Sequence, residues 1–252
     1  MSNSSEGTKA VLLVGGLGTR LRSVVASRPK VLASVGDRPF LELLIRQLRN
    51  QGIRHLVLCT GYLAREIEQE LRDGRIWDVT IEYSKEPNAL GTAGALKLAE
   101  PLVREASDFL VMNGDSFLEI DLQKLVNFHI SSGGIASMAV LRMKNEMRYG
   151  TVQVTSGGRV SGFMEKSAAG SHGFVNAGVY VFNRRIFAHI PDGPGSLERD
   201  VFPKVLDQGV YASEQHGVFI DIGTPDDYAR AQELFKRLEE AATRKQLSGI
   251  SD

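Results

Sequence analysis

Short apolar runs alternate with helical patterns in the first half of the chain. The runs over 9–14 and 109–112 are uninterrupted, which indicates strands buried on both faces of a sheet. Gly52 and Gly74 fall where helix C-termini use glycine. The alternation of strand and helix predicts a parallel sheet with helices on both faces. The predicted strands are Lys9–Val14, Leu56–Thr60, Val79–Tyr83 and Phe109–Met112, and the predicted helices are Pro39–Gln51 and Leu63–Leu71.

The second half of the chain is rich in strand patterns and has few helices. Ser156-Gly157-Gly158 predicts a hairpin turn between two of the strands. A helix over Ser196–Leu206 precedes the strand Val218–Asp221. The other predicted strands of this half are Ile135–Met143, Gly150–Thr155, Arg159–Glu165 and Phe174–Phe182.

The last helix has a well-defined start. Thr224 is its predicted N-cap, Pro225 its first residue, and Asp227 lies three residues after the cap. Tyr228 and Phe235 lie on its apolar face, where they pack either in the core or in the contact of a homodimer. Without repeats or a linker, the chain reads as one α/β domain over 9–240, with a flexible tail over 1–8 and a C-terminal tail over 241–252. The expected fold is Rossmann-like, with a mixed, mostly parallel sheet flanked by helices and a β-rich acceptor half.

Composition narrows the functional classes. The chain has 252 residues, 42% of them apolar, with 30 basic and 30 acidic side chains. Such a balanced charge leaves no global field that would attract nucleic acid or an anionic membrane. The start of the chain has neither a signal sequence nor a membrane span, so we expect a cytoplasmic enzyme. The single cysteine, Cys59, lies in an apolar run and is expected to be buried and inert.

A glycine-rich loop follows the first strand. Gly15, Gly16 and Gly18 let the backbone approach a ligand and point N–H groups inward, which suits phosphate, although a tight turn without a ligand is the alternative. The dinucleotide-binding fingerprint needs a third glycine where Leu21 stands, and a P-loop needs lysine where Thr19 stands.

Two cations distinguish this loop. Arg20 lies within it, and Lys30 follows Pro29 ten residues later. Two cations at one glycine loop fit a triphosphate better than a dinucleotide. A nicotinamide-dependent oxidoreductase, with Asp37 as the ribose-binding acid, is an alternative that the glycine spacing disfavours.

Two apolar strands each lead into an aspartate. Asp115 follows the strand Phe109–Met112, and Asp221 ends the strand near the C-terminus. Ligands of open parallel sheets bind beyond the carboxyl ends of the strands, and Mg²⁺ prefers a few carboxylates together with phosphate oxygens. We therefore predict that Asp115 and Asp221 bind Mg²⁺, although each aspartate alone is also typical of a turn or cap. No Ser–His–Asp arrangement is evident, and His129 lies on a predicted helix without neighbouring metal ligands.

Together these motifs resemble those of the sugar-phosphate nucleotidyltransferases, over residues 9 to 240. The resemblance implies a GT-A-like fold and the condensation of a nucleoside triphosphate with a sugar 1-phosphate, with Mg²⁺ bound and pyrophosphate released. It implies catalytic roles for Arg20, Lys30, Asp115 and Lys166. The nucleotide-binding residues that it implies are Leu12, Gly15, Gly16, Gly18, Thr19, Arg20, Lys30, Glu86, Leu90, Gly91 and Thr92.

The segment 86–94 resembles the base-recognition loop of this family, with the backbone of Gly91 at the base edge. Thymidylyl members carry glutamine where Glu86 aligns. A carboxylate only accepts hydrogen bonds, and guanine offers two adjacent donors, so Glu86 favours GTP. Some uridylyl relatives also carry glutamate here, and a solvated loop charge is the remaining alternative.

The acceptor half also carries motifs similar to those of the family. The resemblance implies that Glu165 and Asn176 hold sugar hydroxyls, that Lys166 pairs with the sugar phosphate, and that Tyr149 and Gly150 line the same pocket.

Within the family, the loop 16–25 and the segment 219–223 look most like those of D-glycero-α-D-manno-heptose 1-phosphate guanylyltransferases. Those relatives usually read Pro-Lys-Pro-Met where this chain reads Pro29-Lys30-Val31-Leu32, which is closer to the general family pattern. A mannose-1-phosphate guanylyltransferase remains an alternative, as does a uridylyl or thymidylyl relative acting on N-acetylmuramate or glucose 1-phosphate. A non-catalytic sugar-nucleotide-binding regulator is the alternative of another class.

Overall fold

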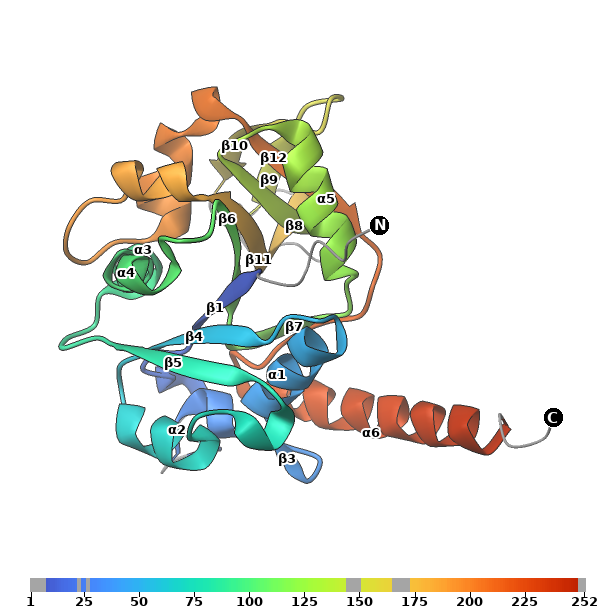
Figure 1. Cartoon of the computed structure of the whole chain (residues 1–252). Coiled ribbons are helices and arrows are strands. Elements are labelled where there is room, and N and C mark those ends of the chain that lie inside the picture. The colour runs from blue at the N-terminus through green and yellow to red at the C-terminus, as the bar shows by residue number, and fades with distance from the viewer. Residues whose placement is uncertain (1–7, 22–23, 26–27, 144–150, 165–172, 249–252) are drawn as a thin grey trace.

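The computed structural model describes residues 8–21, 24–25, 28–143, 151–164 and 173–248 (Figure 1). Four residues predicted to bind the sugar phosphate lie outside these ranges, namely Tyr149, Gly150, Glu165 and Lys166.

The first half of the chain alternates strands and helices, as its apolar pattern predicts. Its elements are β1 (Lys9–Leu13), β2 (Ser34–Val35), β3 (Arg38–Pro39), α1 (Phe40–Asn50), β4 (His55–Thr60), α2 (Ala64–Leu71), β5 (Thr80–Lys85), α3 (Gly91–Leu98), α4 (Glu100–Val103) and β6 (Asp108–Asn113). β5, β4, β1 and β6 lie side by side in that order, all parallel. Sequence analysis did not predict α3, because its glycines and alanines lack a clear apolar period.

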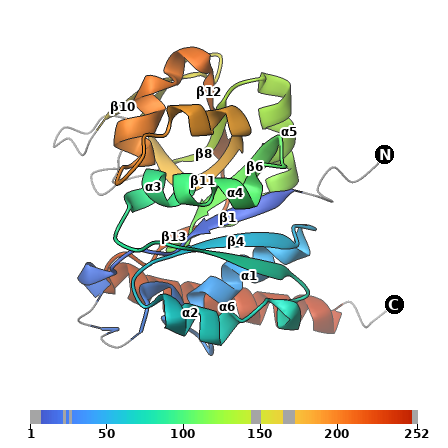
Figure 2. The same ribbon diagram turned by 60° about the vertical axis from the view of Figure 1, so that its left-hand side comes forward.

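β1 is buried on both faces because its side chains alternate between two cores. Ala10 and Leu12 pack in the cluster that contains α1 and α2, whereas Val11 packs with α3 and α4. Figure 2 shows α3 and α4 on one side of the sheet and α1 and α2 on the other. The predicted doubly covered parallel sheet and the α/β fold class are therefore confirmed.

The β-rich half joins this sheet through one long strand. Its elements are β7 (Ser116–Leu118), α5 (Leu122–Ser132), β8 (Ala136–Arg142), β9 (Thr151–Val154), β10 (Val160–Met164), β11 (Phe174–Asn183), β12 (Val210–Gln215) and β13 (Phe219–Asp221). β11 runs antiparallel to β6 over 179–183 and to β9 over 174–175. Between these two pairings its register shifts, and Gly178 has φ +71°. The bulge opens the sheet directly beside the carboxyl end of β6.

The predicted turn at 156–158 is confirmed. The Thr155 N–H donates to Arg159 O at 2.9 Å, and β9 and β10 pair in antiparallel fashion on either side of it. The helix predicted over Ser196–Leu206 is wrong as a single element. It divides into a π-helical turn over Leu197–Val201 and a 3₁₀ turn over Phe202–Lys204. Pro203 has no N–H and cannot continue a regular helix, which explains the division.

The last helix, α6 (Pro225–Ser248), begins with the predicted cap. The Asp227 N–H donates to Thr224 Oγ1 at 3.3 Å, and the Thr224 hydroxyl donates to Asp227 Oδ2 at 2.7 Å. Phe235 packs edge-on against Phe40 and Phe117, with ring centroids 6.4 and 5.5 Å away, so it belongs to the core. The helix continues past residue 240 and extends away from the rest of the molecule (Figure 1).

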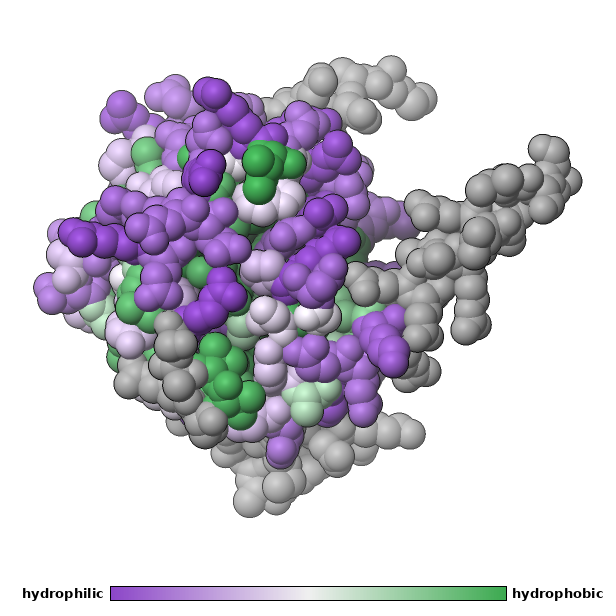
Figure 3. All heavy atoms as spheres, turned by 90° about the horizontal axis from the view of Figure 1, so that it is seen from below, coloured by the Kyte–Doolittle hydropathy of each residue, from purple (hydrophilic) through white to green (hydrophobic). Residues whose placement is uncertain are grey.

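The face seen in Figure 3 is mainly hydrophilic and carries small, separate hydrophobic areas. None of the helices within the described ranges has the length and apolarity needed to span a bilayer.

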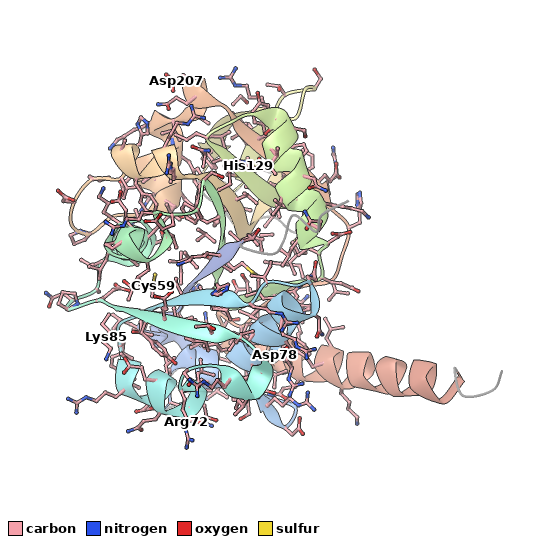
Figure 4. All side chains as sticks on the ribbon, viewed as in Figure 1. Cys59, Arg72, Asp78, Lys85, His129 and Asp207 are labelled. Atoms are coloured by element: carbon pink, nitrogen blue, oxygen red, sulfur yellow. The ribbon has the colours of Figure 1, made fainter. Side chains whose placement is uncertain are left out.

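Cys59 is fully buried, and its Sγ lies 3.5 Å from Ala95 O on α3 (Figure 4). The prediction that Cys59 is buried is therefore confirmed, and burial raises the pKa of its thiol.

A buried histidine links α5 to the sheet at the end of β6 opposite the bulge (Figure 4). His129 Nδ1 lies 3.0 Å from Ser137 Oγ, and its Nε2 lies 3.3 Å from Asp108 Oδ1. Ser137 is fully buried, so this Ser–His–Asp chain has no access to substrate and serves packing. Burial lowers the pKa of His129, and the nearby Asp108 carboxylate only partly opposes this.

We expect His129 to make folding sensitive to mild acid. Its pKa is lower in the folded chain than the ordinary value of 6.5, so the unfolded chain binds more protons below that pH. The free energy of unfolding should therefore fall as the pH drops below about 6.5. Urea unfolding between pH 7.5 and 5.5 should show a smaller decrease for His129→Gln than for the wild type. The exposed His55→Gln should match the wild type; an equal decrease in all three proteins would contradict the prediction.

Candidate active site

Two glycines of the loop after β1 have close neighbours. A Cβ on Gly15 would lie 2.2 Å from Glu86 Oε1. Gly18 has φ +58°, and a Cβ there would lie 2.9 Å from Lys30 Cβ. Gly16, in contrast, has open space around it. The loop therefore packs closely against Glu86 and Lys30 while its middle stays accessible to a ligand.

A pocket beyond β1 and β6 brings together most of the predicted nucleotide-binding residues. Those that line it are Gly15, Gly16, Lys30, Glu86, Gly91 and Thr92. Leu12, predicted to belong to the same set, does not line it, because it is fully buried in β1 within the core. Gly18, Thr19 and Leu90 lie in the adjoining segments but outside the lining.

Glu86 is half-buried in this pocket. Its Oε2 accepts a hydrogen bond from the Leu90 N–H at 2.9 Å. Burial raises the pKa of Glu86, and the Leu90 N–H opposes the shift. One backbone bond thus orients the carboxylate while its other oxygen lies beside the glycine loop.

Gly91, which lines this pocket, is required by chain packing. It has φ +68°, and a Cβ there would lie 2.4 Å from Gly195 O. The same carbonyl accepts from the Ala93 N–H at 3.0 Å, and the Gly195 N–H donates to Leu90 O at 2.8 Å. The start of α3 is therefore clamped against the loop around Gly195, a contact that sequence analysis missed.

A second pocket opens where β11 bulges. Arg20, Asp115, Asn176 and Asp221, which were predicted for the triphosphate, the metal and the sugar, all line it. Asp115 and Asn113 line both pockets, so the two spaces meet at the carboxyl end of β6. A molecule in one pocket would therefore adjoin a molecule in the other.

The two aspartates come together at this junction. β13 pairs with β7 so that Asp221 stands opposite Ser116, and the Ile222 N–H donates to Asp115 O at 3.0 Å. Lys30 Nζ lies 2.8 Å from Asp115 Oδ2 and 4.0 Å from Asp221 Oδ1. Burial and then the charge of Asp115 raise the pKa of Asp221, and Lys30 opposes both.

This arrangement fits a divalent cation. The carboxylates of Asp115 and Asp221 both face the ammonium group of Lys30, so negative charge from two side chains is concentrated at one point. Oxygen donors of this kind suit Mg²⁺, which is usually held by one or two carboxylates together with substrate phosphates. Within the described ranges, no group of three or more His, Cys, Asp or Glu side chains could hold a metal by itself.

Several residues that line the second pocket were not predicted from the sequence. They include Asn113 at the end of β6, and Glu198 and Arg199 in the π-helical turn. The sequence carries no strong signal for Glu198, because its segment is typical of an ordinary helix, and Asn113 and Asn176 of the same pocket are distant along the chain.

Comparison with known proteins agrees with this geometry. A family model described as nucleotidyl transferase matches residues 9–237. The D-glycero-alpha-D-manno-heptose 1-phosphate guanylyltransferase of Aneurinibacillus thermoaerophilus is 40% identical over 226 residues, covering 89% of this chain and 96% of that protein. The mannose-1-phosphate guanylyltransferase catalytic subunit beta of Drosophila melanogaster is 34% identical over 91% of this chain, which spans only 63% of that longer protein.

The fold also matches a solved structure closely. The crystal structure of HddC from Yersinia pseudotuberculosis complexed with GMP-PN superposes with a TM-score of 0.81. It is 32% identical in sequence, and the match covers 90% of this chain and 99% of that one.

Proposed function

Since the chain belongs to the nucleotidyl transferase family, we propose that it condenses a nucleoside triphosphate with a sugar 1-phosphate to give a nucleotide sugar and pyrophosphate. The observation that carries this proposal is the junction of two pockets at Asp115, where Lys30 faces Asp115 and Asp221. Such a junction gives each phosphate-bearing substrate its own space and one shared region of charge. A purely sugar-nucleotide-binding regulator would not need this set of charges.

The nucleotide is proposed to be GTP and the acceptor D-glycero-α-D-manno-heptose 1-phosphate. Glu86 in the first pocket supports guanine, because its carboxylate can accept from the two adjacent donors of that base. The heptose is supported by the relative that is 40% identical over nearly its whole length. Mannose 1-phosphate is the second candidate, supported by the Drosophila relative. Either activity belongs in the cytoplasm, where nucleoside triphosphates are available.

The proposed chemistry is an in-line displacement. An oxygen of the sugar phosphate attacks the α-phosphorus of the triphosphate, the bond to the β-phosphate bridging oxygen breaks, and pyrophosphate leaves. No general base is needed, because a sugar phosphate is already ionised at neutral pH. Arg20 and Lys30 bind the triphosphate, and Lys166 is proposed to position the sugar phosphate. Catalysis is then positioning together with stabilisation of developing negative charge.

Asp115 and Asp221 are proposed to hold Mg²⁺. When bound, the ion would neutralise phosphate charge and polarise the α-phosphoryl group. Lys30 Nζ lies 2.8 Å from Asp115 Oδ2, so its ammonium group belongs to the same cluster of charges as the two proposed metal ligands.

The proposal is tested by a matrix of substrates. Purified protein is mixed with Mg²⁺, one of five nucleoside triphosphates, and mannose, glucose, N-acetylmuramate or heptose 1-phosphate. Pyrophosphate release is expected with GTP and heptose 1-phosphate, and more slowly with mannose 1-phosphate. Release with none of the pairs would overturn the proposed function, and release only with UTP or dTTP would overturn the assignment of the base.

Replacing Glu86 with glutamine is expected to weaken the preference for GTP. The amide keeps an oxygen for the Leu90 N–H but presents a donor to the base edge. Losing one charge-assisted hydrogen bond should lower kcat/KM for GTP about tenfold, while the values for UTP and dTTP stay level or rise. Steady-state pyrophosphate release with each nucleotide measures the ratio. Glu100→Gln on α4 is the control, and an unchanged ratio in Glu86→Gln would remove Glu86 from base recognition.

A further inference from the structure

A carboxylate that has no role yet in the proposed reaction, that of Glu198, lies in the second pocket. This pocket is named the acceptor pocket below, because the proposed function assigns it to the sugar 1-phosphate. Glu198 Oε1 accepts from the Tyr180 hydroxyl at 3.0 Å, and Oε2 accepts from the Ser196 hydroxyl at 2.8 Å. The Thr92 hydroxyl lies 3.4 Å from the same Oε2, and Thr92 also lines the first pocket. Neutral hydroxyls thus hold the group, and no ion pair to Glu198 occurs among the residues that the structure places.

Tyr180 is completely buried, and its hydroxyl fixes two groups of this pocket at once. Its ring stacks on Phe182, with centroids 5.6 Å apart. Because its single hydrogen goes to Glu198, the Tyr180 oxygen accepts from Asn176 Nδ2 at 2.8 Å. Asn176 Oδ1 in turn accepts from the Gly178 N–H at 3.0 Å, which sets the orientation of the amide.

The two oriented groups keep hydrogen-bonding capacity. A carboxylate offers about four lone-pair sites, and three hydroxyls approach Glu198, so one site is left. Asn176 uses one hydrogen of its Nδ2 on Tyr180 and retains the second. Both side chains line the acceptor pocket. One offers an acceptor and the other a donor, which suits the hydroxyls of a sugar.

Charge indicates how an acceptor would lie. An uncompensated carboxylate repels a phosphate, so a sugar phosphate should turn its neutral ring toward Glu198. Arg20 and Arg199 are cations in the lining of the same pocket, but among the described residues neither forms an ion pair with Glu198. The hydroxyl-bearing end of the sugar phosphate therefore belongs near Glu198, and its phosphate belongs at the junction of the two pockets, where its oxygen must meet the triphosphate.

We propose that Glu198 binds a hydroxyl of the acceptor sugar, and that Tyr180 is a positioning residue that orients both Glu198 and Asn176 toward that sugar. This inference rests on the proposed function. Burial, followed by the charge of Glu198, raises the pKa of Tyr180, so its hydroxyl stays protonated and remains a donor at neutral pH.

Two substitutions with steady-state kinetics test the proposal. Tyr180→Phe removes one oxygen from a ring that otherwise keeps its packing, and Glu198→Gln removes the charge. Each should raise KM for mannose 1-phosphate or heptose 1-phosphate about tenfold and leave KM for GTP within about twofold. Tyr83→Phe is the matched control, because that hydroxyl also donates a hydrogen bond, to Arg72 O on the α2 side of the sheet (Figure 4). Thermal unfolding of each variant separates a folding defect from a binding defect.

Monodeoxy analogues of mannose 1-phosphate identify the contact itself. One analogue should bind the wild type about tenfold more weakly than mannose 1-phosphate, and Glu198→Gln should not distinguish the two. The inference would be overturned if Glu198→Gln changed KM for GTP and for the sugar phosphate equally, or left KM for the sugar phosphate unchanged. Both outcomes can be read even if Tyr180→Phe fails to fold. A wild type that turns over no sugar phosphate overturns the proposed function as well, whereas an active wild type with unaffected variants overturns only this inference.

Discussion

Lys30→Ala is expected to lower kcat/KM for pyrophosphate release about 10²–10³-fold, by analogy with the loss of a preorganised charge-stabilising donor in other enzymes. Lys30 is the cation at the centre of the site: its side chain is only 10% exposed, and its ammonium faces both Asp115 and Asp221. Without it, two carboxylates would lie beside a polyphosphate with less compensating charge. The defect should affect every nucleotide and every sugar phosphate alike.

Lys85→Ala supplies a matched control for this substitution. Lys85 Nζ also makes a 2.8 Å ion pair, with Glu68, but its side chain is 61% exposed and lies on β5 outside both pockets (Figure 4). Exposed ion pairs of this kind contribute little to stability, so this variant should behave like the wild type. Turnover by Lys30→Ala within about threefold of the wild type would refute the role proposed for Lys30.

Asp115→Ala is expected to cause a loss of similar size, on the order of 10²–10³-fold in kcat. Asp115 is the proposed metal ligand that lines both pockets. Its side chain is 42% exposed, so the variant should remain folded. It should also need a higher Mn²⁺ concentration to reach half of its residual activity. Binding of Mn²⁺ in the presence of GTP, followed by electron paramagnetic resonance, measures the metal directly and without turnover.

Asp73→Ala is the control for Asp115→Ala, because Asp73 is an exposed aspartate paired with Arg75 away from the site. Normal Mn²⁺ binding by Asp115→Ala would remove Asp115 from the metal site. Normal binding with lost turnover would instead limit Asp115 to a role in charge placement around the phosphates.

Local chemistry made much of this protein readable from its sequence. The uninterrupted apolar run that became β1 can only be satisfied by burial on both faces, which requires a covered parallel sheet. The Thr224-Pro225-Asp227 pattern specifies its own helix start through hydrogen bonds three residues apart. The family and enzyme class predicted from the glycine loop, Lys30 and the two aspartates are confirmed by the family match over 9–237.

The site formed by Asp115, Asp221 and Lys30 was predicted partly from the sequence and established only by the tertiary structure. Sequence position at the ends of apolar strands predicted that Asp115 and Asp221 face a ligand. Only the pairing of β13 with β7, however, places them around the same ammonium group. Leu12, which the family resemblance implies as a nucleotide-binding residue, has its side chain in the core because of the alternation along β1, and it does not line the first pocket.

By itself, the sequence determined the parallel sheet, the loop that suits phosphate, the pair of acidic residues and the family, because each depends on side chains a few positions apart or on short motifs. Only the tertiary structure decided that Gly91 must accommodate the carbonyl of Gly195, and that Tyr180 joins Asn176 to Glu198. The second of these contacts involves irregular segments, since Asn176 lies where the register of β11 shifts and Glu198 lies in the π-helical turn. No periodicity in the chain encodes where such irregular segments meet, because their geometry is set by packing rather than by local hydrogen bonding.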